Sequence, residues 1–428
     1  MRYETIANSL FIKNREKLLT KIKPNSIAIV LSNDEMPRSG DSLFPYRQNA
    51  DLFYLCGINQ EDTVLMLCPD FPDESLREVL FITRSNQLLE TWVGHKLTKE
   101  EATKISGINK VFFIDEMENV MRDLVLHSEN IYLPTNEYLK FKTPVITRDL
   151  RFIAEMKQKY PLHNYFRLTP LVTDLRIIKE AEETEMIKKA INITNSAFRR
   201  VLKFVKPNVA EYEVEAEIMH EFLRNRATGH AFMPIIASGK DACTLHYITN
   251  EKNCISGDLL LIDFGADFAN YAADITRTIP VSGKFTERQR QVYQAVLNVQ
   301  KEATQLLVPG NTIFEYNKAV LEIMDKQLVD LGLYTAQEAA NQSAEKPLVK
   351  KYMPHNISHH LGIDVHDVGS RFLKLQKNMI FTCEPGIYIK EEGIGIRLEN
   401  DILVEDKPIN LSQNIPIEIE EIEELMRG

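Results

Sequence analysis

The chain has 428 residues, 44% hydrophobic and 26% charged, which is ordinary for a globular protein of two or three domains. Its formal net charge of -10 argues against nucleic acid as the main partner, because phosphate binding needs clustered positive charge. No stretch approaches the roughly 18 apolar residues that span a bilayer, and the first twenty residues contain no apolar core of signal-peptide length.

The cysteines are odd in number, widely scattered and without a C-x-x-C pair. We therefore expect neither a disulfide framework nor a zinc knuckle, and a reducing compartment is the default. These features predict a cytoplasmic protein without a membrane partner. The five cysteines are Cys56, Cys68, Cys243, Cys254 and Cys383.

Three short apolar runs in the first part of the chain are typical of buried strands, namely residues 26–31, 63–68 and 79–83. Polar segments that are compatible with helices separate them, and the alternation continues to about Thr169. This pattern favours an α/β domain, to which we assign residues 1–170.

Amphipathic helices follow a charged linker in the second part. Val214, Ile218 and Phe222 recur at four-residue spacing, which is typical of a helix with one buried face. Thr286 and Gln289 form a capping-box pattern, which predicts the start of a further helix.

Strand-like segments lie between and after these helices. Residues 259–279 predict two strands around a turn near residues 268–271, and residues 379–389 and 394–404 predict two more. Helices that flank an antiparallel sheet make residues 171–428 a domain of the α+β class, which is also the fold class we expect for the chain.

Two aspartates lie within apolar segments. Asp263 follows four apolar residues, and Asp274 comes eleven residues later. If the turn between them is central, the two carboxylates face each other across the hairpin, and their repulsion calls for a shared proton or a metal ion. Two unrelated structural aspartates are the alternative, and these two residues leave both interpretations open.

Histidines are clustered in residues 352–369. This segment contains His355, His359, His360 and His366, which are four of the ten histidines in the chain. A single histidine is more often a core or surface residue, but a cluster is typical of a metal site or a proton-transfer site.

Two glutamates, Glu384 and Glu399, complete the candidate site, and each lies within a segment that predicts an apolar strand. Four carboxylates and one imidazole suit divalent manganese, cobalt, iron, magnesium or zinc better than copper or iron–sulfur chemistry. Two divalent ions would neutralise four carboxylates, whereas one ion would leave the pocket strongly anionic. The charge balance therefore favours two metal ions.

At these segments the chain closely resembles aminopeptidase P, in the metallopeptidase family that also contains prolidase, methionine aminopeptidase and creatinase. Five separated motifs occur in the family's order, and the resemblance covers almost the whole chain. It implies a pita-bread C-terminal catalytic domain preceded by a smaller α/β domain. It also implies a dinuclear metal centre whose ligands are Asp263, Asp274, His359, Glu384 and Glu399.

The family pattern divides these ligands between the two ions. Asp263 chelates one ion, and His359 and Glu384 hold the other. Asp274 and Glu399 bridge both. The resemblance favours manganese, with cobalt, zinc or iron as alternatives.

Further residues match the family around this centre. His246 and His366 match histidines on the substrate side, and His355 falls where the family has a further histidine. Arg397 matches an arginine that supports the site, and Tyr388 is expected near it.

The resemblance implies a metalloaminopeptidase that hydrolyses the bond between an N-terminal residue and a following proline in Xaa-Pro-Yaa peptides. A hydroxide activated by the two ions attacks the carbonyl that precedes proline, and Glu384 takes the proton of the water. Prolidase, which cleaves Xaa-Pro dipeptides with the same ligands, is the nearest alternative. A pita-bread module that binds peptides without metal or cleavage is the alternative from another class.

Two segments of the N-terminal domain favour aminopeptidase P over prolidase. Residues 44–57 resemble the N-terminal domain signature of that family. Residues 92–94 resemble a loop that, in the family, can reach the active site of a neighbouring subunit, although a packed aromatic is an alternative role for Trp92. We expect a homo-oligomer, either a dimer or a tetramer.

Overall fold

The computed structural model describes residue 3, residues 5–343 and residues 345–427. The described chain divides into two compact units: the first ends at Arg176, and the second consists of residues from Ile177 onward together with Tyr3. The boundary predicted after residue 170 falls inside helix α7 (Thr169–Arg176). Among the described helices, none combines the length and the apolar content that crossing a membrane requires.

The first unit is built on a mixed sheet of six strands in the order β6-β5-β4-β1-β7-β8 among its described residues. The three predicted strands are confirmed as β1, β4 and β5, to within one residue at each end. Its elements are α1 (Asn8–Leu19), β1 (Ser26–Leu31), β2 (Pro37–Ser39), β3 (Ser42–Leu43), α2 (Ala50–Cys56), β4 (Val64–Leu67), η1 (Glu74–Leu76), β5 (Glu78–Ile82), α3 (Gln87–Val93), α4 (Lys99–Ser106), β6 (Lys110–Phe113), η2 (Ile114–Glu116), α5 (Met117–Leu126), β7 (Asn130–Leu133), α6 (Arg148–Lys159), β8 (Asn164–Arg167) and α7.

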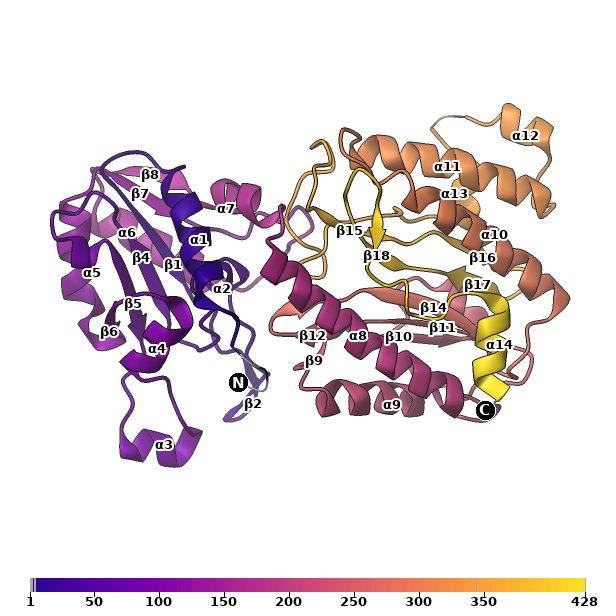
Figure 1. Cartoon of the computed structure of the whole chain (residues 1–428), viewed down its shortest axis with the longest axis horizontal. Coiled ribbons are helices and arrows are strands. Elements are labelled where there is room, and N and C mark those ends of the chain that lie inside the picture. Colours follow the sequence, from indigo (N-terminus) through magenta and orange to yellow (C-terminus); the bar gives the residue numbers. More distant parts are fainter. Residues whose placement is uncertain (1–2, 4, 344, 428) are drawn as a thin grey trace. The chain divides into compact units, whose positions relative to one another are not determined.

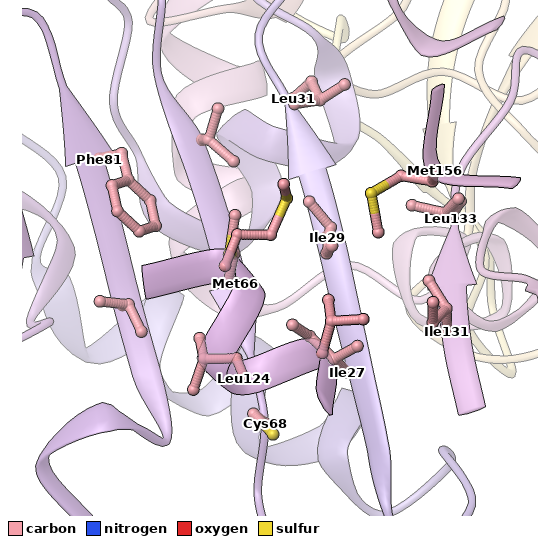
Figure 2. Packing of buried hydrophobic residues seen from close by; sticks show 14 of the residues in the cluster. Ile27, Ile29, Leu31, Met66, Cys68, Phe81, Leu124, Ile131, Leu133 and Met156 are labelled. Carbon is pink, nitrogen blue, oxygen red and sulfur yellow. The ribbon is translucent and has the colours of Figure 1, made fainter. Parts of the chain in front are cut away.

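The core of this unit explains why apolar and polar residues do not alternate along the central strand, β1. Ile27, Ile29 and Leu31 lie on one face of β1 and pack in a cluster with residues of α5 and α6 (Figure 2). Ala28 and Val30 alternate to the opposite face and are also fully buried. A strand buried on both faces requires a continuous apolar run.

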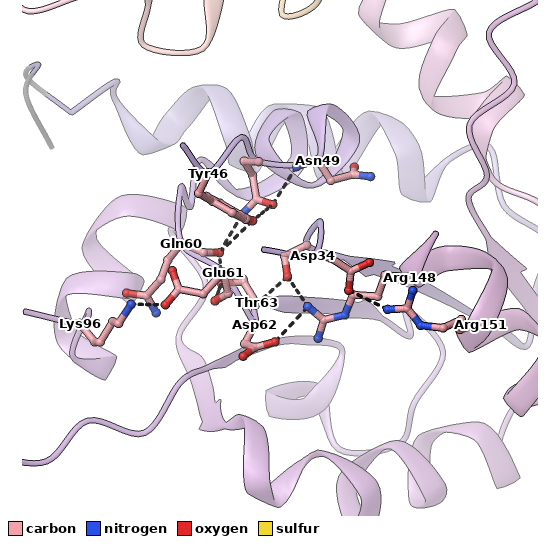
Figure 3. Close-up of polar contacts among 12 residues, drawn as sticks. Asp34, Tyr46, Asn49, Gln60, Glu61, Asp62, Thr63, Lys96, Arg148 and Arg151 are labelled. Carbon is pink, nitrogen blue, oxygen red and sulfur yellow. Dashed lines mark hydrogen bonds and ion pairs between the residues drawn. The ribbon is translucent and has the colours of Figure 1, made fainter. Parts of the chain in front are cut away.

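Ion pairs hold the loops of the first unit together (Figure 3). Arg148 donates to the Ser32 hydroxyl at 2.8 Å and pairs with Asp62 at 3.1 Å. Arg151 pairs with Asp34 at 2.7 Å. Each cation has an acidic partner, so we interpret this network as structural.

The second unit contains helices packed on several small antiparallel sheets (Figure 1). Helices α8 and α9 pack together; α8 also packs against β12, β13 and β14, and α9 against β9 and β10. Helix α10 packs with α11 and against β15 to β17. Its elements are α8 (Ala181–Phe204), α9 (Glu211–Arg224), β9 (Gly229–His230), β10 (Ile235–Ser238), η3 (Gly239–Cys243), β11 (Leu259–Phe264), β12 (Ala266–Phe268), β13 (Tyr271–Ala272), β14 (Ile275–Pro280), α10 (Glu287–Thr304), α11 (Ile313–Asp330), α12 (Ala336–Ala340), α13 (Val349–Tyr352), β15 (Ile380–Cys383), β16 (Gly386–Ile389), β17 (Ile394–Arg397), β18 (Asn400–Leu403), β19 (Ile409–Asn410) and α14 (Ile419–Arg427).

The helix predictions in this unit are confirmed. Val214, Ile218 and Phe222 are fully buried along one face of α9. Thr286 caps α10, because its hydroxyl accepts from the Gln289 N–H at 3.3 Å while the Gln289 side chain accepts from the Thr286 N–H at 2.9 Å.

The hairpin that carries the two aspartates turns where the sequence predicts, between Phe268 and Tyr271, but its register does not pair the two aspartates. Its turn is formed by Ala269 and Asn270, both with positive φ, as in a type I′ turn. Asp263 therefore lies opposite Thr276 in the β11–β14 ladder, and Asp274 comes just before β14. The expectation that the two aspartates are directly opposed is wrong, because the turn is centred one residue later than that pairing requires.

The sequence predicted that each of the two glutamates lies inside a continuous strand, and the structure shows that this prediction is wrong. Glu384 separates β15 from β16, and Glu399 separates β17 from β18. At each break the backbone bonds to another segment: the Glu384 N–H donates to the Ile357 carbonyl at 2.9 Å, and the Glu399 N–H donates to the Thr276 carbonyl at 3.0 Å. These interruptions bring both carboxylates beside β14 and the histidine segment.

Candidate metal centre

The carboxylate and imidazole groups from distant parts of the second unit converge. Ligand atoms of Asp274, His359 and Glu399 all lie within 4.8 Å of one another. The Nε2 atom of His359 is 3.3 Å from Asp274 Oδ2 and 3.8 Å from Glu384 Oε1. The site therefore combines the segment before β14 and both strand breaks with the histidine segment.

Hydrogen bonds fix the orientation of His359. Its Nδ1 lies 2.9 Å from the His360 carbonyl, which can only accept, so Nδ1 carries the proton. Its backbone N–H donates to the Thr382 hydroxyl at 3.2 Å. The lone pair of Nε2 is thereby directed toward the carboxylates, as in a histidine prepared to bind a metal.

A second chain of contacts connects Asp263 to His355. Arg397 donates to Asp263 Oδ2 at 2.5 Å and to the Tyr388 hydroxyl at 2.9 Å. The Tyr388 hydroxyl in turn lies 2.9 Å from His355 Nε2, while His355 Nδ1 donates to the Asn356 carbonyl at 2.7 Å. Burial lowers the pKa of His355 to about 3, so this imidazole is neutral and can accept from Tyr388.

The electrostatics of the cluster call for cations. Burial, together with the charges of Asp263 and Asp401, raises the pKa of Asp274 well above its usual value. Burial and the neighbouring Asp274 do the same for Glu399. Asp263 Oδ1 is buried and has no hydrogen-bond partner among the described residues. Oxygen-rich ligands, an oriented imidazole and this unpaired oxygen fit a divalent metal site.

The raised pKa values predict how stability of the metal-free protein depends on pH. The folded protein retains protons that the unfolded chain releases near pH 4, so its free energy of unfolding should fall as pH rises above about 4. Bound metal should offset this loss, by about 2.7 kcal/mol when its concentration is ~100-fold above Kd. Denaturant titrations of chelated and metal-saturated protein across this pH range test the expectation, and a metal-free protein that gains stability with pH contradicts it.

The other predicted histidines lie in different environments. The His366 ring packs edge-on against the His359 ring, with centroids 4.3 Å apart. His246 is exposed on the loop after η3, near enough to His355 to contribute to lowering its pKa. His360 is buried against Phe381, with ring centroids 4.2 Å apart, and has a structural position beside the site.

Both units of the chain match models of known protein families. Residues 185–406 match the model of metallopeptidase family M24, and residues 11–132 match the aminopeptidase P N-terminal domain. The chain belongs to metallopeptidase family M24. The expected resemblance to aminopeptidase P, the pita-bread catalytic domain and the preceding α/β domain are thereby confirmed.

Similar proteins carry names from the same family. The Xaa-Pro aminopeptidase of Escherichia coli is 35% identical, over 98% of this chain and 98% of that protein. The Xaa-Pro aminopeptidase of Haemophilus influenzae is 34% identical, over 97% of this chain and 96% of that protein.

Solved structures show the same likeness. Zinc-substituted aminopeptidase P of Escherichia coli, in complex with product, has a TM-score of 0.88 and 33% identity, with 99% of both chains covered. Proline aminopeptidase P II of Yersinia pestis has a TM-score of 0.87 and 34% identity, with 98% of this chain and 99% of that chain covered.

Several residues that shape this M24 centre were not singled out from sequence. The Thr276 hydroxyl donates to Glu399 Oε2 at 2.6 Å, and Thr382 accepts from the backbone of His359. Asp401 accepts from the Asp274 N–H at 3.2 Å. A polar residue inside an apolar strand was the available signal for each of them, but their partners depend on strand register.

Proposed function

We propose that this M24 protein is a metalloaminopeptidase that removes the N-terminal residue from peptides with proline in the second position. The observation that carries the proposal is the convergence of Asp274, His359, Glu384 and Glu399 in a chain that aligns over almost its full length with Xaa-Pro aminopeptidases. The site offers hydrolytic chemistry, and the N-terminal domain match supports the aminopeptidase P branch.

We infer that the centre holds two divalent ions, with manganese as the favoured metal. Asp263 would hold one ion, His359 and Glu384 the other, and Asp274 and Glu399 both. Asp263, Asp274 and Glu399 are buried and Glu384 is partly buried. Even with Arg397 paired to Asp263, one divalent ion would leave these four carboxylates with a net negative charge, which supports a count of two. Bound there, such ions supply Lewis acidity toward a peptide carbonyl and make water a better nucleophile near neutral pH.

Glu384 is suited to move the proton of the attacking water. Its Oε1 faces His359 at 3.8 Å, and its Oε2 faces His355 at 3.7 Å. Burial raises the pKa of Glu384, so its carboxylate can take a proton from water and pass it to the leaving proline nitrogen. His246 and His366 flank the site and would donate hydrogen bonds to the substrate carbonyl.

Prolidase activity is the less favoured alternative, since the relatives from Haemophilus influenzae and Escherichia coli, which match over almost the full length of both chains, are named Xaa-Pro aminopeptidases. A non-catalytic binding module is disfavoured because all five ligand residues are present and ligand atoms of Asp274, His359 and Glu399 lie within 4.8 Å of one another.

We also propose that the protein acts in the cytoplasm as a homo-oligomer, either a dimer or a tetramer. Exposed apolar side chains on α3 support an assembly, because Leu88 is 70%, Trp92 80% and Val93 54% exposed. Free cysteines support a reducing compartment.

A metal-dependence assay tests the activity. Dialysis against a chelator should abolish hydrolysis of Xaa-Pro-Yaa tripeptides, and added Mn²⁺ should restore it. We expect tripeptides to exceed Xaa-Pro dipeptides in kcat/KM by about tenfold or more, as lost substrate contacts usually cost that much.

The same assay separates the alternatives. A preference for dipeptides would assign the protein to prolidase. If no divalent metal supports hydrolysis, the non-catalytic binding module is the remaining interpretation. Metal analysis of the purified protein measures the stoichiometry, and a ratio of one ion per chain contradicts the dinuclear centre.

A further inference from the structure

A buried carboxylate outside the metal centre gathers four hydrogen bonds. Glu211, the first residue of α9, is 0% exposed. Its Oε1 accepts from the Ser238 N–H at 2.8 Å and from the Ser238 hydroxyl at 2.6 Å. Its Oε2 accepts from the Tyr247 hydroxyl at 2.8 Å and from the Lys252 N–H at 3.0 Å. The charge is therefore compensated on both oxygens and held rigidly.

These four donors enclose the loop that carries His246. Ser238 lies at the end of β10, before this loop, and Lys252 lies after it. Tyr247 directly follows His246 in the chain. The backbone of Glu211 is fixed to the same loop, because its N–H donates to the Lys252 carbonyl at 2.9 Å. One side chain thus fixes both ends of the loop and the residue beside His246.

The neighbours of His246 are packed while His246 itself is exposed. Leu245 and Tyr247 pack against a cluster that includes Ile235 and Tyr388. Tyr388 is the residue that bonds both to Arg397 and to His355 at the metal centre. The loop and the metal centre therefore rest on the same apolar cluster, and the bond from Tyr247 to Glu211 sets how the loop sits on it.

We propose that Glu211, acting through Tyr247, is a positioning residue that fixes His246 for catalysis. This inference rests on the proposed function, in which His246 binds the substrate carbonyl. Errors of about 1 Å in such a group can lower turnover by about 10²-fold. Among the described residues, the four hydrogen bonds of Glu211 go to Ser238, Tyr247 and Lys252 and none to a proposed metal ligand. An effect of Tyr247 on turnover can therefore pass through His246 or through the apolar cluster that Tyr247 shares with Tyr388, and the two routes are distinguishable by experiment.

A double-mutant cycle tests this coupling. We expect Tyr247→Phe to lower kcat/KM for Xaa-Pro-Yaa peptides by about tenfold, mainly in kcat, and His246→Ala to lower it by about 10²-fold. The double variant should be no slower than His246→Ala, because Tyr247 then has nothing left to position. Effects that multiply in the double variant overturn the proposal.

A matched control removes a comparable hydroxyl elsewhere. Tyr165 is also half-buried and donates to the Met156 carbonyl at 2.8 Å within the first unit. Tyr165→Phe should leave kcat/KM unchanged, whereas a loss equal to that of Tyr247→Phe would assign the effect to general destabilisation and overturn the proposal.

Amide hydrogen exchange provides a readout that does not depend on turnover. Glu211→Gln should accelerate exchange of the amides in residues 244–252 while leaving those of β11 protected, and metal content should not change. Unchanged exchange in that loop overturns the proposal. If the wild-type protein hydrolyses no Xaa-Pro peptide, the proposed function fails, and the exchange result alone decides whether Glu211 holds the loop.

Discussion

Replacing Glu384 with glutamine is expected to lower kcat by about 10³-fold or more, because the amide cannot take a proton from water. The variant should nevertheless fold. Burial raises the pKa of Glu384, which means that its charged form lowers the free energy of unfolding of the metal-free protein. A neutral amide at this position removes that destabilisation. Steady-state kinetics with a Xaa-Pro-Yaa peptide, together with the thermal midpoint of the chelated protein, measure both effects.

A nearby glutamate supplies the control for this variant. Glu391 lies between β16 and β17 with its side chain 64% exposed, and it pairs with Lys351 at 3.1 Å. Glu391→Gln should leave turnover unchanged. Turnover near the wild-type rate in Glu384→Gln would remove the proposed proton transfer, and a loss of the folded state would show that the carboxylate has a structural role.

Replacing Gly265 with alanine is expected to destabilise the protein by about 3 kcal/mol and to lower its metal content. A Cβ atom at this position would lie 1.7 Å from the Ala273 carbonyl oxygen, which belongs to the backbone and cannot rotate away. Gly265 follows β11, which carries Asp263, and Ala273 precedes Asp274. Relieving the clash must therefore separate the two aspartates. Denaturant titration and metal analysis measure the two consequences.

A second glycine distinguishes the clash from ordinary backbone strain. Gly332 has φ of +73° and no heavy atom within 4 Å of an added Cβ. Gly332→Ala should cost about 1 kcal/mol through its left-handed backbone, without loss of metal. Equal losses of stability and metal content in both variants would contradict the assignment of Gly265 as the contact that holds the aspartates together.

Local patterns in the sequence were sufficient for many elements. The continuous apolar run of β1 reflects burial on both faces, and Thr286 with Gln289 marks the start of α10, because both signals depend on residues close in the chain. The four candidate carboxylates were recognisable as charged residues within apolar segments, where a charge requires compensation, and His359 was recognisable as a member of a histidine cluster.

Features that depend on pairing between distant segments were not predictable in the same way. The register that places Asp263 opposite Thr276 depends on two residues of the turn, and a shift of that turn changes every pairing. The strand breaks at Glu384 and Glu399 depend on carbonyls supplied by Ile357 and Thr276. Glu211 likewise appears in the sequence as one more acidic residue at a helix start, because its four donors come from a loop 27 to 41 residues away.

The guanidinium of Arg397 has a consequence for the order in which the enzyme matures. This positive charge is permanent and lies beside Asp263 in the proposed metal centre. The Arg397 side chain is 5% exposed and the Asp263 side chain 13% exposed. A zinc finger, by contrast, has no stable fold until its ion arrives. We expect that this chain completes its architecture first and takes up its ions afterwards, so that metal supply governs the active fraction of enzyme rather than its yield.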